Sequence, residues 1–165
     1  MHFCIFSDSH GDADAIRRAL ERQVTPPDAV LFLGDGIRDL SDRENGVPVW
    51  RVRGNCDWFA ERDVPVEKIL RMEDHALFLT HGHTYGVKSG IGGLLAAGIR
   101  AGCDLILFGH THEPYLETLP TGTEVCGKTL DRPVTLFNPG SIGYGGSFGT
   151  LCLQKNVALF GHGTL

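Results

Sequence analysis

Two side chains that can bind a metal ion, Asp8 and His10, follow the short apolar run FCIF near the start of the chain. Such a run is typical of a buried strand, and Gly11 then allows the backbone to turn sharply away. Residues two apart on an extended chain point to the same side, so this carboxylate and this imidazole can bind the same cation. Alone, an Asp-x-His pair is a weak signal for a metal site, and it gains weight only from later segments of the same kind.

Four later segments end in the same way as the first. They read GD at residues 34–35, GNCD at 54–57, HGH at 81–83 and GHTH at 109–112. Each follows a run that predicts a strand, and the carboxyl ends of strands line the binding crevice of an open α/β sheet. The candidate metal ligands are therefore Asp8, His10, Asp35, Asn55, His81, His110 and His112.

This set of ligands mixes imidazole, carboxylate and one amide oxygen, with no thiolate that must be included. Such a mixture suits manganese, iron, zinc, cobalt or nickel better than a structural zinc centre built on cysteines. Seven ligands are too many for one tetrahedral ion. Two ions that share one bridging carboxylate would receive about four contacts each, which is the construction of a two-metal hydrolytic site.

Apolar periodicity indicates which elements position these ligands. Residues 12–23 show helical spacing between two apolar runs, which predicts a strand, helix, strand unit, and a second helix is expected at residues 94–101. After the opening run, strands are expected at residues 29–33, 48–52, 64–72, 76–80, 104–108, 115–119, 123–126, 134–137, 149–153 and 157–160. The strands at 64–72 and 76–80 should form an antiparallel pair, and the glycines of 140–149 should form a flexible loop. Mixed strands with helices outside predict an α/β fold, a two-sheet β-sandwich flanked by helices.

The bulk composition predicts one soluble domain over residues 1–165. The formal net charge of -5 argues against general nucleic-acid binding. The longest apolar runs are too short to span a bilayer and no export signal is visible, so a cytoplasmic protein is expected. The five cysteines lack CxxC spacing, and all but Cys56 lie in or beside apolar or strand-like runs. Reduced, mostly buried thiols are therefore expected.

The order of the motifs D-x-H, GD, GNCD, HGH and GHTH resembles the calcineurin-like metallophosphoesterase superfamily, specifically its small bacterial and archaeal phosphodiesterases. The resemblance covers nearly the whole chain, and NPGS at residues 138–141 looks like a late segment of that subgroup. Carried over residue by residue, it implies one ion held by Asp8, His10, Asp35 and His112, and another held by Asp35, Asn55, His81 and His110. Asp35 would be the bridge.

The activity implied by this resemblance is that of a metal-dependent phosphoesterase, with a phosphodiesterase as the first choice. Two divalent ions, manganese first and iron, nickel, cobalt or zinc as alternatives, would lower the pKa of a bridging water, and the hydroxide would attack phosphorus in line with the leaving group. The formal charge of such a site is about +1, which attracts a small phosphate ester to an acidic protein. The candidate catalytic residues are Asp35, Asn55 and His83.

One residue departs from the wider superfamily, whose larger enzymes carry histidine where this chain has Cys56. A thiol is a poorer acid for a leaving oxygen. Protonation of the leaving group then falls to His83, Asp57 or water, so esters with good leaving groups, such as aryl diesters, should be hydrolysed best. The structural alternatives are that His83 orients its neighbours and that Asp57 hydrogen-bonds its own loop.

Two other functions fit the same fold. One is a non-catalytic protein-interaction scaffold, like the eukaryotic retromer subunit that this family resembles. In that subunit the ligand after the first Asp is altered, whereas His10 is intact here. The other is a protein phosphatase, which would require a larger surface for its substrate and a histidine at the position of Cys56. Both rank below a phosphodiesterase.

Surface residues near the site offer two further expectations. Trp58 and Phe59, which follow the GNCD turn, would form core or an exposed apolar lip, and self-association is one use of such a lip. Selection of the substrate should depend on the loops at residues 41–46, 85–92 and 143–147.

Overall fold

Two β-sheets packed against each other form the centre of the computed structural model, which describes residues 1–58 and 63–165. In spatial order the first sheet consists of β13 (Val157–Thr164), β12 (Ser147–Gln154), β1 (His2–Phe6), β2 (Ala29–Phe32), β4 (Val47–Arg51) and β3 (Arg43–Glu44). The second consists of β5 (Glu67–Met72), β6 (His75–Thr80), β7 (Leu105–Leu107), β11 (Val134–Pro139) and β8 (Pro114–Leu119). A small ribbon pairs β9 (Glu124–Val125) with β10 (Lys128–Thr129).

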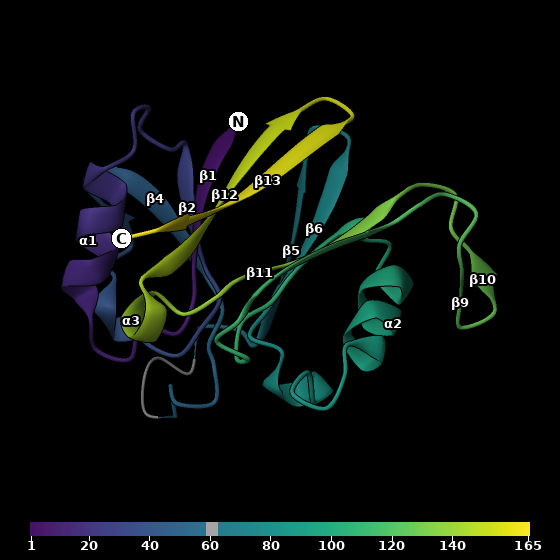
Figure 1. Ribbon diagram of the computed structural model, residues 1–165, viewed down its shortest axis with the longest axis horizontal. Coiled ribbons are helices and arrows are strands. Elements are labelled where there is room, and N and C mark those ends of the chain that lie inside the picture. The colour runs from purple at the N-terminus through teal and green to yellow at the C-terminus, as the bar shows by residue number, and fades with distance from the viewer. Residues whose placement is uncertain (59–62) are drawn as a thin grey trace.

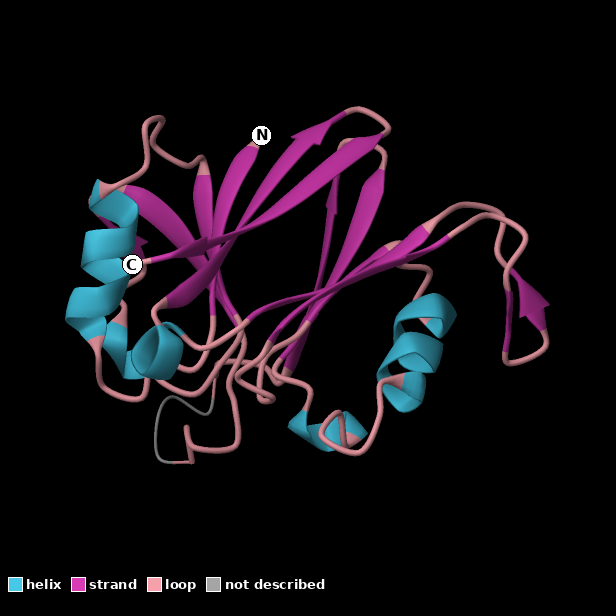
Figure 2. Cartoon of the chain, in the orientation of Figure 1, coloured by secondary structure: helices cyan, strands magenta, loops and turns pink. Residues whose placement is uncertain are grey.

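The helices lie outside the two sheets. They are α1 (Ala13–Glu21), α2 (Gly92–Arg100) and α3 (Ile142–Gly145), with two 3₁₀ turns, η1 (Ile37–Asp39) and η2 (His83–Tyr85). Figure 1 shows α1 beside the first sheet and α2 beside the second, and Figure 2 shows the same layers by element type. The expected α/β fold with a two-sheet sandwich and flanking helices is confirmed.

Strand β1 illustrates how the sequence produces these layers. Its side chains alternate between faces: Phe3 and Ile5 are buried between the sheets, whereas Cys4 and Phe6 are buried in a second apolar cluster with α1. A third cluster buries α2 against the second sheet. Because β1 packs on both faces, its sequence is continuously apolar rather than alternating, as in buried parallel strands.

The unit at the start of the chain forms as expected. Strand β1 pairs in parallel with β2, and α1 connects them. The helix begins where Asp12 accepts a hydrogen bond from the backbone N–H of Ala15 at 2.9 Å. Strands β5 and β6 form the predicted antiparallel pair.

Several short elements differ from the expectations. The predicted flexible loop at 140–149 contains α3 and the start of β12, since the Ser141 hydroxyl accepts from the N–H of Tyr144 and begins a helical turn. The loop at 41–46 contains β3. Of the thiols that were expected to be mostly buried, Cys4 and Cys103 are buried and Cys152 is partly buried, whereas Cys126 is exposed next to the small ribbon.

The apolar lip is described only in part. Trp58 is 79% exposed, which excludes a core position, and Phe59 lies outside the described residues. None of the helices in the described parts of the chain has the length and apolar character that crossing a membrane requires.

Candidate metal centre

The loops that follow β1, β2, β6 and β7 meet at one end of the sandwich (Figure 1). Backbone hydrogen bonds join them: the N–H of His10 donates to the carbonyl oxygen of Asp35 at 3.1 Å, and the N–H of Gly109 donates to that of His81 at 3.1 Å. The strand ends therefore bring together side chains that lie up to about a hundred residues apart in sequence, as the spacing between Asp8 and His110 illustrates.

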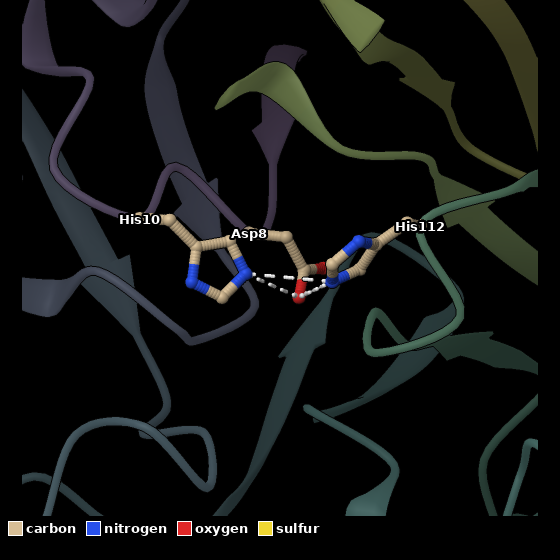
Figure 3. Close-up of side chains that lie close together, drawn as sticks. All are labelled: Asp8, His10 and His112. Carbon is tan, nitrogen blue, oxygen red and sulfur yellow. Dashed lines mark hydrogen bonds and ion pairs between the residues drawn. The ribbon is translucent and has the colours of Figure 1, made fainter. Parts of the chain in front are cut away.

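A first group of ligands consists of Asp8, His10 and His112 (Figure 3). The Oδ1 atom of Asp8 lies 3.2 Å from Nε2 of His112 and 3.7 Å from Nε2 of His10. The two Nε2 atoms are 3.4 Å apart. Three ligand atoms therefore converge on one point, although His10 and His112 are 102 residues apart in the sequence.

A second group consists of Asp35, His81 and His110, whose ligand atoms lie within 4.8 Å of one another. Nε2 of His81 is 3.2 Å from Oδ2 of Asp35 and 3.8 Å from Oδ1 of Asp8. The second contact joins this group to the first. Two adjacent clusters of ligands, rather than one, are what a pair of ions requires.

Each carboxylate is anchored through one oxygen and presents the other to the site. Oδ2 of Asp8 accepts from the Ser7 hydroxyl at 2.5 Å and from the His110 N–H at 3.1 Å, which leaves Oδ1 for the first group. Oδ1 of Asp35 accepts from the N–H of Cys56 at 2.7 Å, which leaves Oδ2 for the second. Such anchoring orients a metal ligand before the metal arrives.

Buried polar atoms without partners test whether the site fits a metal. Oδ1 of Asp8, Nε2 of His81 and Oδ1 of Asn55 are buried and have no hydrogen-bond partner among residues 1–58 and 63–165. Leaving a buried acceptor unpaired is costly, so these atoms require a partner. On His81, Nδ1 lies 2.7 Å from the Leu33 carbonyl oxygen, which fixes its proton and leaves Nε2 as the free donor of a lone pair. The residues present therefore fit divalent metal ions.

The backbone at the site is strained. Asp8, His10, Asp35, His110 and His112 all have φ between 47° and 69°, in the left-handed region. This conformation is unfavourable for residues other than glycine, and it persists where the surrounding structure enforces it, often at functional sites. Here it turns each ligand back toward the centre directly after its strand.

The carboxylates in and beside the second group favour a positive charge close to them. Burial lowers the pKa of His81, but the carboxylates of Asp35 and Asp8 outweigh burial and raise it overall. Burial raises the pKa of the Asp35 carboxyl, but His81 and the Cys56 amide outweigh it, and the net pKa is low. Burial and the neighbouring His81 lower the pKa of His110 to about 4, so this imidazole is neutral and able to bind a metal near pH 7.

The other two predicted site residues, Asn55 and His83, line the same recess. Asn55 donates from Nδ2 to the sulfur of Cys56 at 3.3 Å. Cys56 is exposed, and its sulfur lies within 4.8 Å of ligand atoms of His10 and Asp35. The His83 ring is centred 5.5 Å from that of His81, and its buried Nδ1 has no hydrogen-bond partner in the described part of the chain.

Asp57 is a structural residue. Its Oδ1 accepts from the N–H groups of Gly36 and Ile37, and its Oδ2 accepts from those of Asp35 and Gly54, at 2.7 to 3.1 Å. With both oxygens engaged and 6% of its surface exposed, it cannot reach a leaving group. The prediction that it bonds its own loop was too narrow, since it also fixes the loop after β2.

Two residues hold the loops from behind; the sequence favoured a structural role for Asn138 and indicated none for Ser141. Asn138 donates from Nδ2 to the Gly109 carbonyl at 2.9 Å, and the Ser141 hydroxyl donates to the Asp8 carbonyl at 2.8 Å. The NPGS segment that contains both was the available signal. Tyr144 lies in the loop at residues 143–147 that was expected to select the substrate, but no role was predicted for the residue itself; its ring stacks on His112 at a centroid distance of 5.3 Å.

Comparisons with known proteins agree with this architecture. A model of the calcineurin-like phosphoesterase superfamily domain matches residues 1–157. YsnB of Bacillus subtilis, named a probable metallophosphoesterase, is 29% identical, over 86% of this chain and 75% of the relative. The phosphodiesterase YfcE of Escherichia coli is 30% identical, over 86% of this chain and 79% of the relative. A single mutant of Vps29 from Entamoeba histolytica matches with a TM-score of 0.69 and 20% identity, over 100% of this chain and 99% of that chain, which shows a shared fold.

Proposed function

The chain belongs to the calcineurin-like phosphoesterase superfamily, and from this premise we propose that it is a phosphodiesterase that uses two divalent metal ions, manganese in the first place. The observation that carries the proposal is the pair of adjacent ligand groups, Asp8 with His10 and His112, and Asp35 with His81 and His110. The substrate would be a small phosphate ester, because the acidic chain does not favour binding to long nucleic acids.

When bound, two divalent ions supply positive charge for the phosphate and an activated water for in-line attack on phosphorus. The first would be held by Asp8, His10, Asp35 and His112, and the second by Asp35, Asn55, His81 and His110. Asp35 is suited to be the bridge because its carboxylate lies 3.2 Å from Nε2 of His81 in the second group, and a carboxylate oxygen also lies within 4.8 Å of a ring nitrogen of His10 in the first group.

The side chains of this protein contribute orientation and proton transfer. Ser7 and the Cys56 N–H keep the two carboxylates in place, and Leu33 fixes the tautomer of His81. Of the groups considered for protonating the leaving oxygen, Asp57 is excluded by its four hydrogen bonds, so His83 or water takes this role. His83 lies beside the second group, and burial and the neighbouring His81 lower its pKa.

The alternative function, a scaffold without catalysis, is less well supported. The likeness to Vps29 extends over the whole chain but concerns the fold alone. His10 is present and its Nε2 lies 3.4 Å from that of His112, so the first group is complete. A scaffold has no need of strained backbone and unpaired buried atoms at this position.

The proposal is tested by hydrolysis of a panel of mono-, di- and cyclic phosphates. Metal-stripped protein is resupplied with Mn, Ni, Co, Zn or Mg, and product formation is measured. We expect no activity without metal, recovery with manganese, and aryl diesters hydrolysed faster than alkyl monoesters. A protein that hydrolyses no ester with any of these metals would favour the scaffold, and faster hydrolysis of an alkyl monoester would contradict the preference for diesters.

A further inference from the structure

A recess of about 470 Å³ adjoins the candidate metal centre. It is lined by His10 and Asp35 of the two ligand groups, and also by Arg38 of η1 and Tyr144 of α3. Its volume lies in the range that accepts one drug-sized organic group. A phosphate at the metal centre would therefore place one of its ester groups in or beside this recess.

Tyr144 is the residue that gives the recess a chemical preference. Its ring is nearly parallel to that of His112, with an interplanar angle of 20°, and its centroid lies 5.1 Å from that of His10. It is nevertheless 73% exposed. One face thus rests on a metal-ligand imidazole while the other remains open, and such an open aromatic face is suited to stacking on another planar ring.

A second recess near the site is the poorer fit. It measures about 270 Å³ and is lined by Trp58, Arg53 and His83. Trp58 is equally exposed at 79%, but no ring contact ties it to a ligand histidine in the parts of the chain that the structure describes. The larger recess, with its ring already stacked on His112, is the better candidate for a nucleoside-sized group.

We infer that the recess at Tyr144 binds the planar aromatic group of the substrate, an aryl ring or a nucleobase linked to the phosphate, and that Tyr144 stacks on that group. The inference rests on the proposed function, because it names the class of phosphodiester that the same site accepts. Tyr144 is a specificity-determining residue here, and Arg38 lines the same recess.

Calorimetric titration of the manganese-loaded protein tests this inference without relying on turnover. The probes are adenosine 5′-monophosphate and ribose 5-phosphate, which differ by the base. We expect the nucleotide to bind about tenfold more tightly, since stacking of one base on an aromatic side chain accounts for a difference of this order. Tyr144→Ala should remove the preference, whereas Tyr144→Phe, which keeps the ring, should retain it. Trp58→Ala should also retain it.

The manganese content of each variant is measured as a control, because Tyr144 contacts two ligand histidines. Equal affinity for the two probes in the wild type, or a preference that survives Tyr144→Ala, would overturn the inference, as would a preference lost only in Trp58→Ala. Hydrolysis of diesters without base-dependent binding contradicts this inference alone. Base-dependent binding without any hydrolysis contradicts the proposed function alone.

Discussion

Individual side chains at the site use one atom as an anchor and leave another atom as a candidate metal ligand. Asp8 and Asp35 each use one oxygen to bind a neighbouring donor and present the other to the site. His81 does the same with its two ring nitrogens. Because the anchored atom fixes the orientation, the free atom needs little reorganisation when a metal binds. Substitutions that keep the anchor but change the free atom therefore test the metal site without disturbing the loops.

Asp35→Asn is such a substitution. The amide oxygen can still accept from the Cys56 N–H, but the negative charge beside His81 is lost. We expect hydrolysis of an aryl diester to fall by about a hundredfold or more, together with loss of bound metal, while the circular dichroism spectrum stays unchanged. Asp14→Asn on the exposed face of α1 is the control. Turnover like that of the wild type in Asp35→Asn would rule out a bridging role.

Asp57→Ala tests the structural role of a buried carboxylate. Four backbone N–H groups would lose their acceptor, so we expect the free energy of unfolding to fall by about 3 kcal/mol or more, measured by urea denaturation. Asp14→Ala removes only an exposed ion pair and should cost under about 1 kcal/mol. If Asp57 were a general acid instead, its loss would abolish activity and leave stability unchanged.

The raised pKa of His81 predicts the pH dependence of metal binding. In the metal-free protein the proton on His81 contributes stability that is complete below its ordinary pKa of 6.5 and is lost as the pH rises through the raised value. A metal ion must displace that proton, so manganese affinity should increase as the pH rises from 6.5 through the raised pKa of His81. Calorimetry in buffers of different ionisation enthalpy measures both affinity and proton release. Affinity independent of pH, without proton release, would contradict this coupling.

The sequence could indicate candidate ligands because each follows one of the predicted strands, as in HGH at residues 81–83. The supporting contacts could not. Asp57 binds N–H groups about twenty residues earlier in the chain, and Ser141 donates to Asp8 across 133 residues. Such contacts depend on how the loops meet in space, and neither residue type nor spacing records that.

Loops after β2 and β4 cross at a close approach of two glycines. A Cβ on Gly34 would lie 2.5 Å from the backbone nitrogen of Gly54, and Gly34 also has a φ of 96°. A side chain here would push apart the loops that carry Asp35 and Asn55. The metal site thus depends on an approach of two backbones that only glycine permits.

Gly34→Ala should therefore destabilise the protein more than a matched change elsewhere. The control is Gly46→Ala in the turn before β4, where φ is 82° but no atom lies within 4 Å of the added Cβ. Left-handed backbone costs each variant about 1–2 kcal/mol, and the contact should add about 1–3 kcal/mol in Gly34→Ala alone. Equal midpoints of urea denaturation in the two variants would show that the loop crossing is unimportant.

Elements with strong periodicity were predictable, and short ones were not. The apolar spacing of residues 12–23 predicts α1 because one face of that helix is buried. The four-residue helix α3 begins at a single cap, Ser141, in a glycine-rich segment. Because glycine is unfavourable in helices, the composition of this segment predicted a loop. The two-residue strands, such as β3, pair with a neighbouring strand but are too short to show a periodic pattern in the sequence.

In the molecule as a whole, the residues that stabilise the fold and the residues of the candidate metal site lie in different regions. Three apolar clusters, one between the sheets and one under each of the helices α1 and α2, hold the sandwich together. The strained and unpaired ligand residues gather at one end of it. The fold should therefore survive removal of metal and loss of single ligands, and these changes should affect the site alone.

The central claim is that two adjacent ligand groups hold two metal ions. The most direct test is anomalous diffraction from crystals of the protein grown with manganese. Two anomalous peaks are predicted, one among Asp8, His10 and His112 and the other among Asp35, His81 and His110. The absence of manganese from both groups, or its binding elsewhere on the molecule, would contradict the account.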